Sequence, residues 1–147
     1  MFKLAHEAET HSGRSYFCDE NGTVISRKHD GSQERTLAQA NAGYKRKYKR
    51  VTLGYGNQVY VHRLVGALFL PNEDVLPEIN HKNLNTNDNR VCNLEWCTRE
   101  YNAQYSQNIA MHLLGYGFGE VKVTDELDEA IKGYTDEELY IIGSKDV

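Results

Sequence analysis

Asparagine and histidine residues in the second half of the chain have spacings that could serve the hydrolysis of a phosphodiester. Asn80 and His81 are adjacent, Asn93 follows His81 by twelve positions, and Asn102 follows Asn93 by nine. Such hydrolysis needs an activated water, a cation that neutralises charge on the phosphate, and stabilisation of the departing oxygen. Histidine has a pKa suited to proton transfer near neutral pH. The set is therefore a candidate catalytic centre.

A second candidate is the run from residue 44 to residue 50, which contains five basic residues interleaved with two tyrosines. Basic side chains neutralise backbone phosphates and give salt-sensitive, sequence-tolerant affinity. The alternative is a solvated strand face, which is the usual role of a charged run. Arg27 and Lys28 could widen the same surface. The residues predicted to contact DNA are Lys45, Arg46, Lys47, Lys49, Arg50, Arg63 and Arg90.

Two turn-forming sequences divide the first half of the chain into hairpins. Asn21-Gly22 lies between β-prone residues, and both residues tolerate a positive φ. Gly54-Tyr55-Gly56-Asn57 separates a second pair of β-prone runs. The expected strands are residues 15–18, 23–27, 47–53 and 58–61. The first half is thus predicted to be an antiparallel β-meander.

The residues around the candidate centre predict a strand, a loop, a second strand and a helix. The expected elements are a short amphipathic helix at 62–70, strands at 76–81 and 91–97, a polar loop at 82–90, and a helix from an N-cap at Thr98 to a C-cap at Gly115. Such a unit can bring Asn80 and His81, at the end of one strand, against Asn102 in the first turn of the last helix. Because neighbouring residues on a strand face opposite ways, Asn80 and His81 can serve different roles.

The stretch from Asn80 to Asn102 resembles the HNH endonuclease family, and within it the branch common among phage and intron homing endonucleases. That branch carries Asn-His, then Asn-Arg-x-x-Asn-Leu-Glu-Trp-x-Thr, then a final Asn. The three parts here are Asn80-His81, residues 89–98, and Asn102. Residues 60–65 and 69–72 also look like the segment that precedes the motif in that branch. The resemblance covers roughly residues 44–106.

The resemblance implies an endonuclease that nicks or cuts double-stranded DNA and leaves 5′-phosphate and 3′-hydroxyl ends. His81 would be the general base that deprotonates water. Asn80 and Asn102 would be oxygen ligands of one Mg²⁺, for which Mn²⁺ or another divalent cation can substitute. Asn93 would tie down the loop so that His81 points correctly. The alternative function is a DNA-binding or regulatory protein that keeps the HNH fold without turnover.

Four residues of the motif depart from the common family pattern. Many HNH enzymes have Asp or His where this chain has Asn80 and Asn102, and two neutral amides bind a hard cation poorly. Mg²⁺ keeps several waters and shares its coordination with substrate phosphates, so the site is expected to fill only when DNA supplies oxygens. Leu84 stands where the family usually has Gly, and Asp88 where it usually has Asn. These two departures concern the conformation of the loop.

Several neighbouring residues have simpler interpretations. His62 could assist at the phosphate, but a histidine that opens an amphipathic helix is at least as typical of a structural group, so it is left outside the catalytic set. Leu94 and Trp96 alternate along the predicted strand and are expected in the core. Three loop asparagines are typical of Asx turns: Asn85, Asn87 and Asn89.

The composition is that of an ordinary soluble protein, with a mean hydropathy of -0.67 and no apolar run long enough to cross a membrane. The N-terminus lacks the apolar core of a signal peptide, so the expected location is the cytoplasm, that of the host cell if the chain is phage-encoded. The three cysteines form no CxxC pair, and neither a disulfide framework nor a structural zinc is expected.

The net charge of -4 is unevenly distributed. Residues 1–70 contain 11 Lys and Arg against 6 Asp and Glu, whereas residues 111–147 contain 3 against 9. The basic half suits DNA, and the acidic tail could bind a protein partner or a second copy of the chain in a homodimer. The predicted α+β chain therefore has antiparallel hairpins with the basic patch at 1–61, a ββα-metal nuclease unit at 62–115, and a short acidic helical tail at 116–147.

Overall fold

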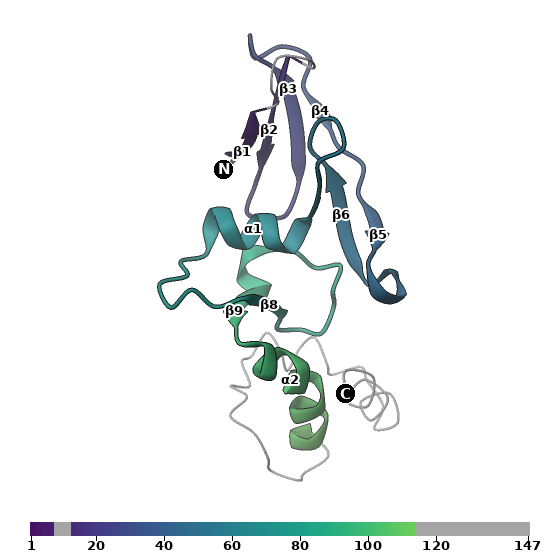
Figure 1. Ribbon diagram of the computed structural model, residues 1–147, viewed down its shortest axis with the longest axis vertical. Helices are drawn as coiled ribbons and strands as arrows, with labels where there is room; N and C mark the ends of the chain where they lie inside the picture. Colours follow the sequence, from purple (N-terminus) through teal and green to yellow (C-terminus); the bar gives the residue numbers. More distant parts are fainter. Residues whose placement is uncertain (8–12, 114–147) are drawn as a thin grey trace.

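The computed structural model describes residues 1–7 and 13–113, which form antiparallel strands and two α-helices (Figure 1). The predicted α+β class is confirmed. The predicted tail at 116–147 and the C-cap at Gly115 lie outside the described residues. Within the described ranges, no helix is long and apolar enough to span a membrane.

The first sheet contains four strands in the order β1-β2-β3-β4. Its strands are β1 (Lys3–Glu7), β2 (Arg14–Cys18), β3 (Val24–Lys28) and β4 (Arg35–Thr36). The predicted hairpin around Asn21-Gly22 is confirmed as β2 and β3, but of these two residues only Gly22 has a positive φ, at 80°. The Asp19 carboxylate completes the turn, because one of its oxygens accepts the backbone N–H groups of Asn21 and Thr23.

The second sheet has the order β5-β6-β7 and extends beside the first sheet (Figure 1). It consists of β5 (Ala40–Ala42), β6 (Tyr48–Thr52) and β7 (Gln58–Tyr60), with the 3-10 turn η1 (Tyr44–Arg46) between β5 and β6. The predicted second hairpin is confirmed as β6 and β7. The sequence did not indicate β5, and the basic run divides between η1 and β6.

The third sheet is the pair β8 (Glu78–His81) and β9 (Leu94–Cys97), preceded by α1 (Val61–Phe69) and followed by α2 (Arg99–Leu113). The predicted strand at 91–97 is wrong at its start, because Val91–Asn93 forms the 3-10 turn η2. In this turn the Asn93 backbone N–H donates to the Arg90 carbonyl at 2.9 Å, and the Asn93 side-chain amide bonds to the loop. The predicted N-cap is confirmed, since Thr98 Oγ1 accepts the Tyr101 N–H at 3.1 Å.

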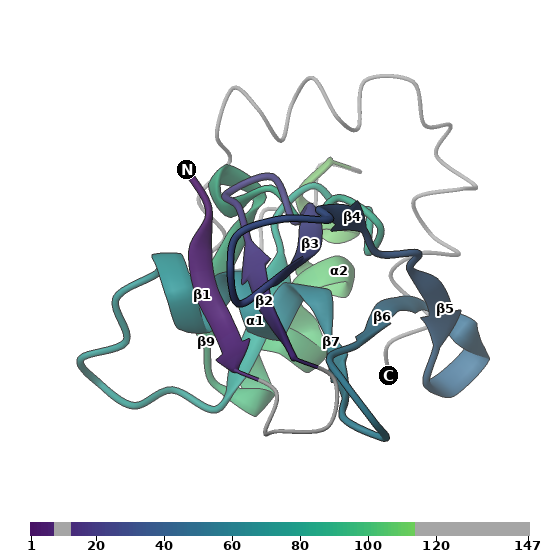
Figure 2. The ribbon, with the colours of Figure 1, turned by 90° about the horizontal axis from the view of Figure 1, so that it is seen from above.

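Helix α1 lies between the first sheet and the β8–β9 pair (Figure 1), and Figure 2 shows it beneath β1 and β2. A Cβ at Gly66 would lie 2.2 Å from Ile79 Cδ1, so the absence of a side chain lets α1 approach β8. Leu94 is buried and Trp96 packs against the same core, as predicted. This core joins residues on both sides of position 61, and the proposed segment boundaries stay predictions.

Candidate active site at the end of strand β8

Strand β8 places Asn80 and His81 on opposite faces of the two-stranded sheet. The register pairs Asn80 with Glu95 and His81 with Leu94. Both side chains are buried, with 5% of each residue exposed. The sequence therefore positioned this pair correctly, and each residue meets a different environment.

His81 forms a hydrogen bond with Asn89 in which Nε2 lies 2.8 Å from Oδ1. Because an amide oxygen only accepts, this contact assigns the proton to Nε2 and leaves the lone pair on Nδ1. A buried imidazole held in this tautomer has one nitrogen available as a base. Asn89, which the sequence suggested as an Asx-turn residue, is instead the orienting partner of His81.

Asn89 is buried against the turn that joins β2 to β3. A Cβ at Gly22 would lie 3.0 Å from the Asn89 Cβ, and the Val91 N–H donates to the Glu20 carbonyl at 2.8 Å. A side chain at position 22 would therefore press on the partner of His81. The Asn21-Gly22 sequence predicted the hairpin, but its support of His81 follows only from the three-dimensional packing.

The environment of His81 lowers its pKa, and burial is the main cause. The hydrogen bond to Asn89 and the charge of Asp88 oppose this shift, whereas the charge of Lys47 adds to it. The lowered pKa favours a neutral imidazole at neutral pH, and the neutral imidazole is the form that accepts a proton. Tyr48 stacks on His81, with ring centroids 6.1 Å apart.

His62, at the start of α1, lies beside His81 with ring centroids 5.3 Å apart. Burial, with smaller effects from His81 and Arg63, lowers its pKa to about 3. Its Nδ1 atom is buried and has no hydrogen-bond partner among the described residues. His62 is therefore a neutral ring packed against Tyr48 and His81.

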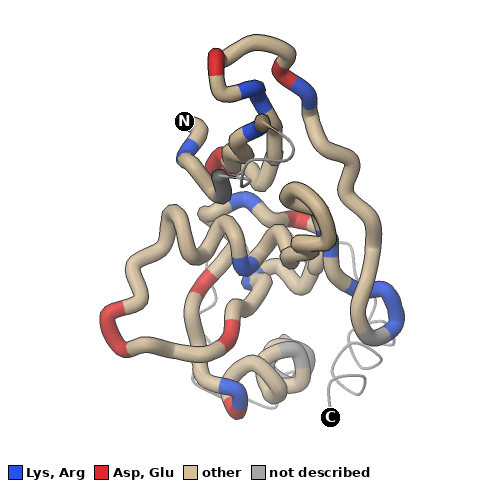
Figure 3. The backbone as a smooth tube through the Cα atoms, turned by 45° about the horizontal axis from the view of Figure 1, so that its top comes forward, with Lys and Arg blue, Asp and Glu red and all other residues tan. Residues whose placement is uncertain are grey.

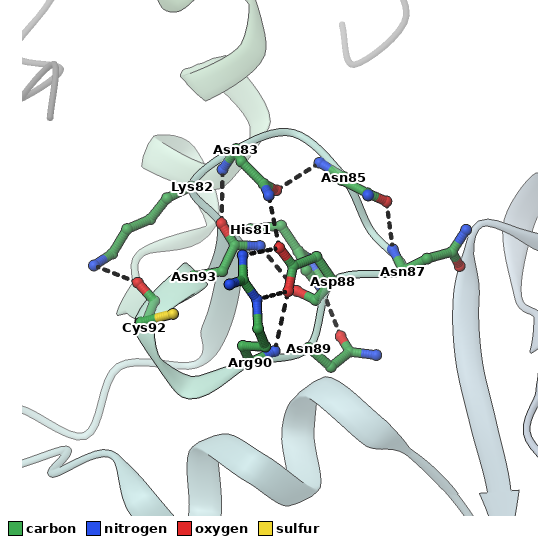
Figure 4. A network of polar contacts seen from close by, with 10 residues as sticks. All are labelled: His81, Lys82, Asn83, Asn85, Asn87, Asp88, Asn89, Arg90, Cys92 and Asn93. Atoms are coloured by element: carbon green, nitrogen blue, oxygen red, sulfur yellow. Dashed lines mark hydrogen bonds and ion pairs between the residues drawn. The ribbon is translucent and has the colours of Figure 1, made fainter. Parts of the chain in front are cut away.

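A network of side-chain hydrogen bonds fixes the loop that follows His81 (Figure 4). Asn93 Oδ1 accepts the Asn83 N–H at 2.9 Å, and its Nδ2 donates to the Asp88 carbonyl at 2.8 Å. The Asn93 carbonyl also accepts the Lys82 N–H. These bonds are the ones a loop anchor would make, and a catalytic contribution of Asn93 stays a prediction.

The two unusual loop residues both have structural partners. Leu84 has a φ of 66°, a conformation that suits glycine, and its side chain packs against Tyr105 and Ile109. Asp88 accepts hydrogen bonds from Asn83 and Arg90, and these bonds lower the pKa of its carboxyl, the bond from Arg90 most strongly. Both departures are thus accommodated by contacts of the loop itself and of α2.

Asn80 faces α2 together with Glu95, and its Nδ2 donates to Glu95 Oε1 at 2.8 Å. Asn102 lies in the first turn of α2, as predicted, with a half-buried side chain. Within the described part of the chain, no hydrogen bond joins the Asn102 side chain to Asn80 or His81. The sequence did not assign a role to Glu95.

A hard cation fits these residues only with help from other ligands. The described residues contain no cluster of three or more His, Cys, Asp or Glu that could hold a metal. They do provide the Asn80 amide beside the Glu95 carboxylate, with Asn102 in the first turn of the following helix, and oxygen is the donor that Mg²⁺ prefers. This donor set suits a cation that shares its coordination with water and phosphate.

Five of the seven predicted DNA-contacting residues lie on the β5–β6 hairpin, where Lys45, Arg46 and Lys47 form the tip and Lys49 and Arg50 follow along β6. Figure 3 shows basic residues gathered at the tip of this hairpin. Lys45 and Arg46 are exposed, and Lys47 joins this hairpin to the site loop, because its carbonyl accepts a 2.6 Å hydrogen bond from Thr86. The other two are engaged elsewhere. Arg63 donates to the Pro77 carbonyl on the way to β8, and Arg90 pairs with Asp88 in the loop.

Comparisons with known proteins give a consistent result. Residues 59–104 match the family model described as HNH endonuclease. An uncharacterized HNH endonuclease of Acanthamoeba polyphaga mimivirus is 37% identical over 51 residues, which are 35% of this chain and 16% of that protein. A structure of DNA binding and cleavage by the HNH homing endonuclease I-HmuI has a TM-score of 0.55 and 25% identity. The match covers 90% of this chain and 66% of that chain, so this chain spans only part of both relatives.

Proposed function

We propose that the protein hydrolyses phosphodiester bonds of double-stranded DNA in a metal-dependent reaction, and that it does so with the segment at 59–104 that matches the HNH endonuclease model. The observation that carries the proposal is the buried His81, whose hydrogen bond to Asn89 leaves Nδ1 as its basic nitrogen. This histidine lies inside the matched segment, at the end of β8.

In the proposed reaction, His81 Nδ1 accepts a proton from a water molecule as the water oxygen attacks phosphorus. The bond between phosphorus and the 3′ oxygen breaks, which yields a 5′-phosphate and, after protonation, a 3′-hydroxyl. Burial keeps His81 neutral before the step, and Asn89 can stabilise the cation formed afterwards because it accepts from Nε2. Asn93 keeps the loop in place during the step.

Asn80 and Asn102 would hold the cation, with the remaining positions filled by water and DNA oxygens. When bound, a Mg²⁺ or Mn²⁺ ion would neutralise charge on the phosphate and stabilise the departing oxygen. Because Asn80 and His81 leave β8 on opposite faces, the cation and the base would approach one phosphate from different sides. Tight Mg²⁺ binding to the DNA-free protein in calorimetry would contradict this shared coordination.

The β5–β6 hairpin would contact the DNA backbone next to the reacting phosphate. The hairpin is attached to the site loop through Thr86 and Lys47, and its tip presents Lys45 and Arg46 to solvent. These cations suit phosphates and would give affinity without strong sequence preference.

The direct test is the nicking of supercoiled plasmid DNA with Mg²⁺ or Mn²⁺. We expect the wild type to convert plasmid to open-circular or linear forms, EDTA to stop it, and His81→Ala to be inactive. A wild type that binds plasmid but never cuts it under these conditions would replace the proposal with a DNA-binding protein that keeps the fold. Cleavage by His81→Ala at the wild-type rate would reject His81 as the base.

A further inference from the structure

Glu95 is a carboxylate beside the proposed cation site to which the sequence assigned no role. It lies opposite Asn80 in the β8–β9 register, on the face of the pair that α2 covers. Its side chain is half-buried, and its Oε1 accepts the 2.8 Å hydrogen bond from Asn80 Nδ2.

This hydrogen bond fixes which end of the Asn80 amide faces Glu95. A carboxylate can only accept, so the Asn80 NH₂ group must point toward it. From α2, the Tyr105 hydroxyl donates to the Lys82 carbonyl at 2.8 Å, close to Asn80 along the chain. With its NH₂ group held by Glu95, Asn80 Oδ1 is left as a ligand oxygen, with no hydrogen-bond donor to it among the described residues.

The charge of Glu95 also bears on the low cation affinity expected of two amide ligands. Asn80 and Asn102 are neutral, whereas ligand charge is a main source of affinity for a hard cation. Glu95 brings a negative charge into hydrogen-bond contact with one of these amides, in a half-buried position where solvent screens it less.

We propose that Glu95 is a positioning residue of the cation site: it holds Asn80 with Oδ1 available to the cation and supplies negative charge that the two amide ligands lack. This inference rests on the proposed function, because it concerns the same cation. Glutamine at this position would retain the shape but lose the charge, and its own amide could turn either end toward Asn80. Alanine would remove the acceptor altogether.

The test measures Mn²⁺ binding by electron paramagnetic resonance to the protein on a short mixed-sequence duplex. His81→Ala serves as the background, so that the DNA stays intact. In this background, Glu95→Ala is expected to weaken Mn²⁺ binding about 10- to 100-fold, the usual cost of losing an outer partner of a metal ligand. Glu95→Gln is expected to weaken it less, and Glu100→Gln, which removes an exposed charge from the first turn of α2, not measurably.

Cleavage by proteins that retain His81 gives the second readout. We expect Glu95→Gln to need more Mg²⁺ for half-maximal nicking and to approach the wild-type rate when the metal is saturating. Wild-type Mn²⁺ affinity in both Glu95 variants, with duplex binding intact, would overturn the inference. If Glu95→Ala does not fold, the metal affinity of Glu95→Gln alone tests the inference.

The two proposals fail in distinguishable ways. A wild type that never cuts DNA rejects the proposed function, and the Mn²⁺ titrations still decide the role of Glu95. If the wild type cuts DNA but the Glu95 variants keep their metal affinity, the proposed function stands and the proposed role of Glu95 is rejected. No Mn²⁺ binding to any of the complexes rejects the inference about Glu95, and the plasmid assay alone then decides the proposed function.

Discussion

The site loop at 82–93 and the tip of the β5–β6 hairpin lie next to each other but are built in different ways. In the loop, side chains fold back onto the backbone, and Asn93 and Asn89 are buried (Figure 4). At the tip, Lys45 and Arg46 are exposed and have positive φ values of 56° and 51°. Chemistry at one phosphate requires fixed geometry, whereas attraction to a phosphate backbone requires mainly charge.

The two regions meet at Lys47. Its carbonyl accepts a hydrogen bond from Thr86 in the loop, and its ammonium charge lowers the pKa of His81. A change at the tip that spares Lys47 is therefore expected to affect binding alone, and a change in the loop to affect geometry and chemistry.

The largest expected effect on stability comes from Asn93→Ala. The substitution removes the partners of the Asn83 N–H and the Asp88 carbonyl, both partly buried. Groups left unsatisfied in this way cost about 1–3 kcal/mol each, so we expect the free energy of unfolding to fall by about 2–4 kcal/mol in urea titrations.

Asn87→Ala is the matched control, because Asn87 belongs to the same loop but is exposed. We expect its free energy of unfolding to stay within about 0.5 kcal/mol of the wild type. Equal losses in both variants would mean that the Asn93 side chain does not anchor the loop.

His62 gives the next largest effect, as a dependence of stability on pH. Its pKa is about 3 in the folded protein, and that of an unfolded histidine is about 6.5. The unfolded chain therefore binds the extra proton first, and stability is lost as the pH falls through 6.5 toward 3.

His62→Phe is expected to reduce the loss of unfolding free energy between pH 7 and pH 5 by about 2 kcal/mol, since the phenyl ring cannot take up a proton. His81 is retained in both proteins and continues to titrate. If the variant loses as much unfolding free energy between pH 7 and pH 5 as the wild type does, His62 is not held neutral in the core.

Removing charge at the tip should weaken DNA binding without changing the chemistry. The triple variant Lys45→Ala, Arg46→Ala and Lys49→Ala is expected to bind duplex about tenfold more weakly at moderate salt, with a shallower salt dependence. The charge-matched control replaces Lys122, Lys132 and Lys145 with alanine. Equal weakening in both triple variants would mean that net charge matters and the hairpin does not.

The smallest expected effects are shifts of the pH at which cleavage becomes half-maximal. The rate should rise with pH through the lowered pKa of His81, because the neutral ring is the base. Lys47→Met removes a charge that lowers this pKa, so the midpoint should move up. Asn89→Ala removes a hydrogen bond that raises it, so the midpoint should move down. Shifts in the same direction would contradict this account of the His81 environment.

The sequence predicted elements whose signals are local. Asn21-Gly22 marked a hairpin, Thr98 capped a helix, and the spacing of the motif located β8 and α2. It did not predict β1, β4, β5 or the two 3-10 turns, because short strands have little periodicity and a single turn, such as η2 with its hydrogen bond from the Asn93 N–H to the Arg90 carbonyl, has no repeating pattern.

The partners of the candidate site were harder to predict than its members. His81 and Asn80 stood out by residue type and spacing, whereas Asn89 belonged to the motif but was interpreted only as an Asx-turn residue. Its contact with His81 depends on how the loop closes against the turn at Gly22. Glu95 was part of the recognised motif, but its hydrogen bond to Asn80 follows from the register of β8 and β9.

The most direct test of a separation between chemistry and affinity is a single-turnover cleavage assay on DNA saturated with protein, with the dissociation constant measured on the same samples. His81→Ala should lose about 10²- to 10⁴-fold in rate and keep its affinity. The tip variant should lose affinity and keep its rate at saturation. A His81→Ala protein that binds normally and cuts at nearly the wild-type rate would contradict the central claim.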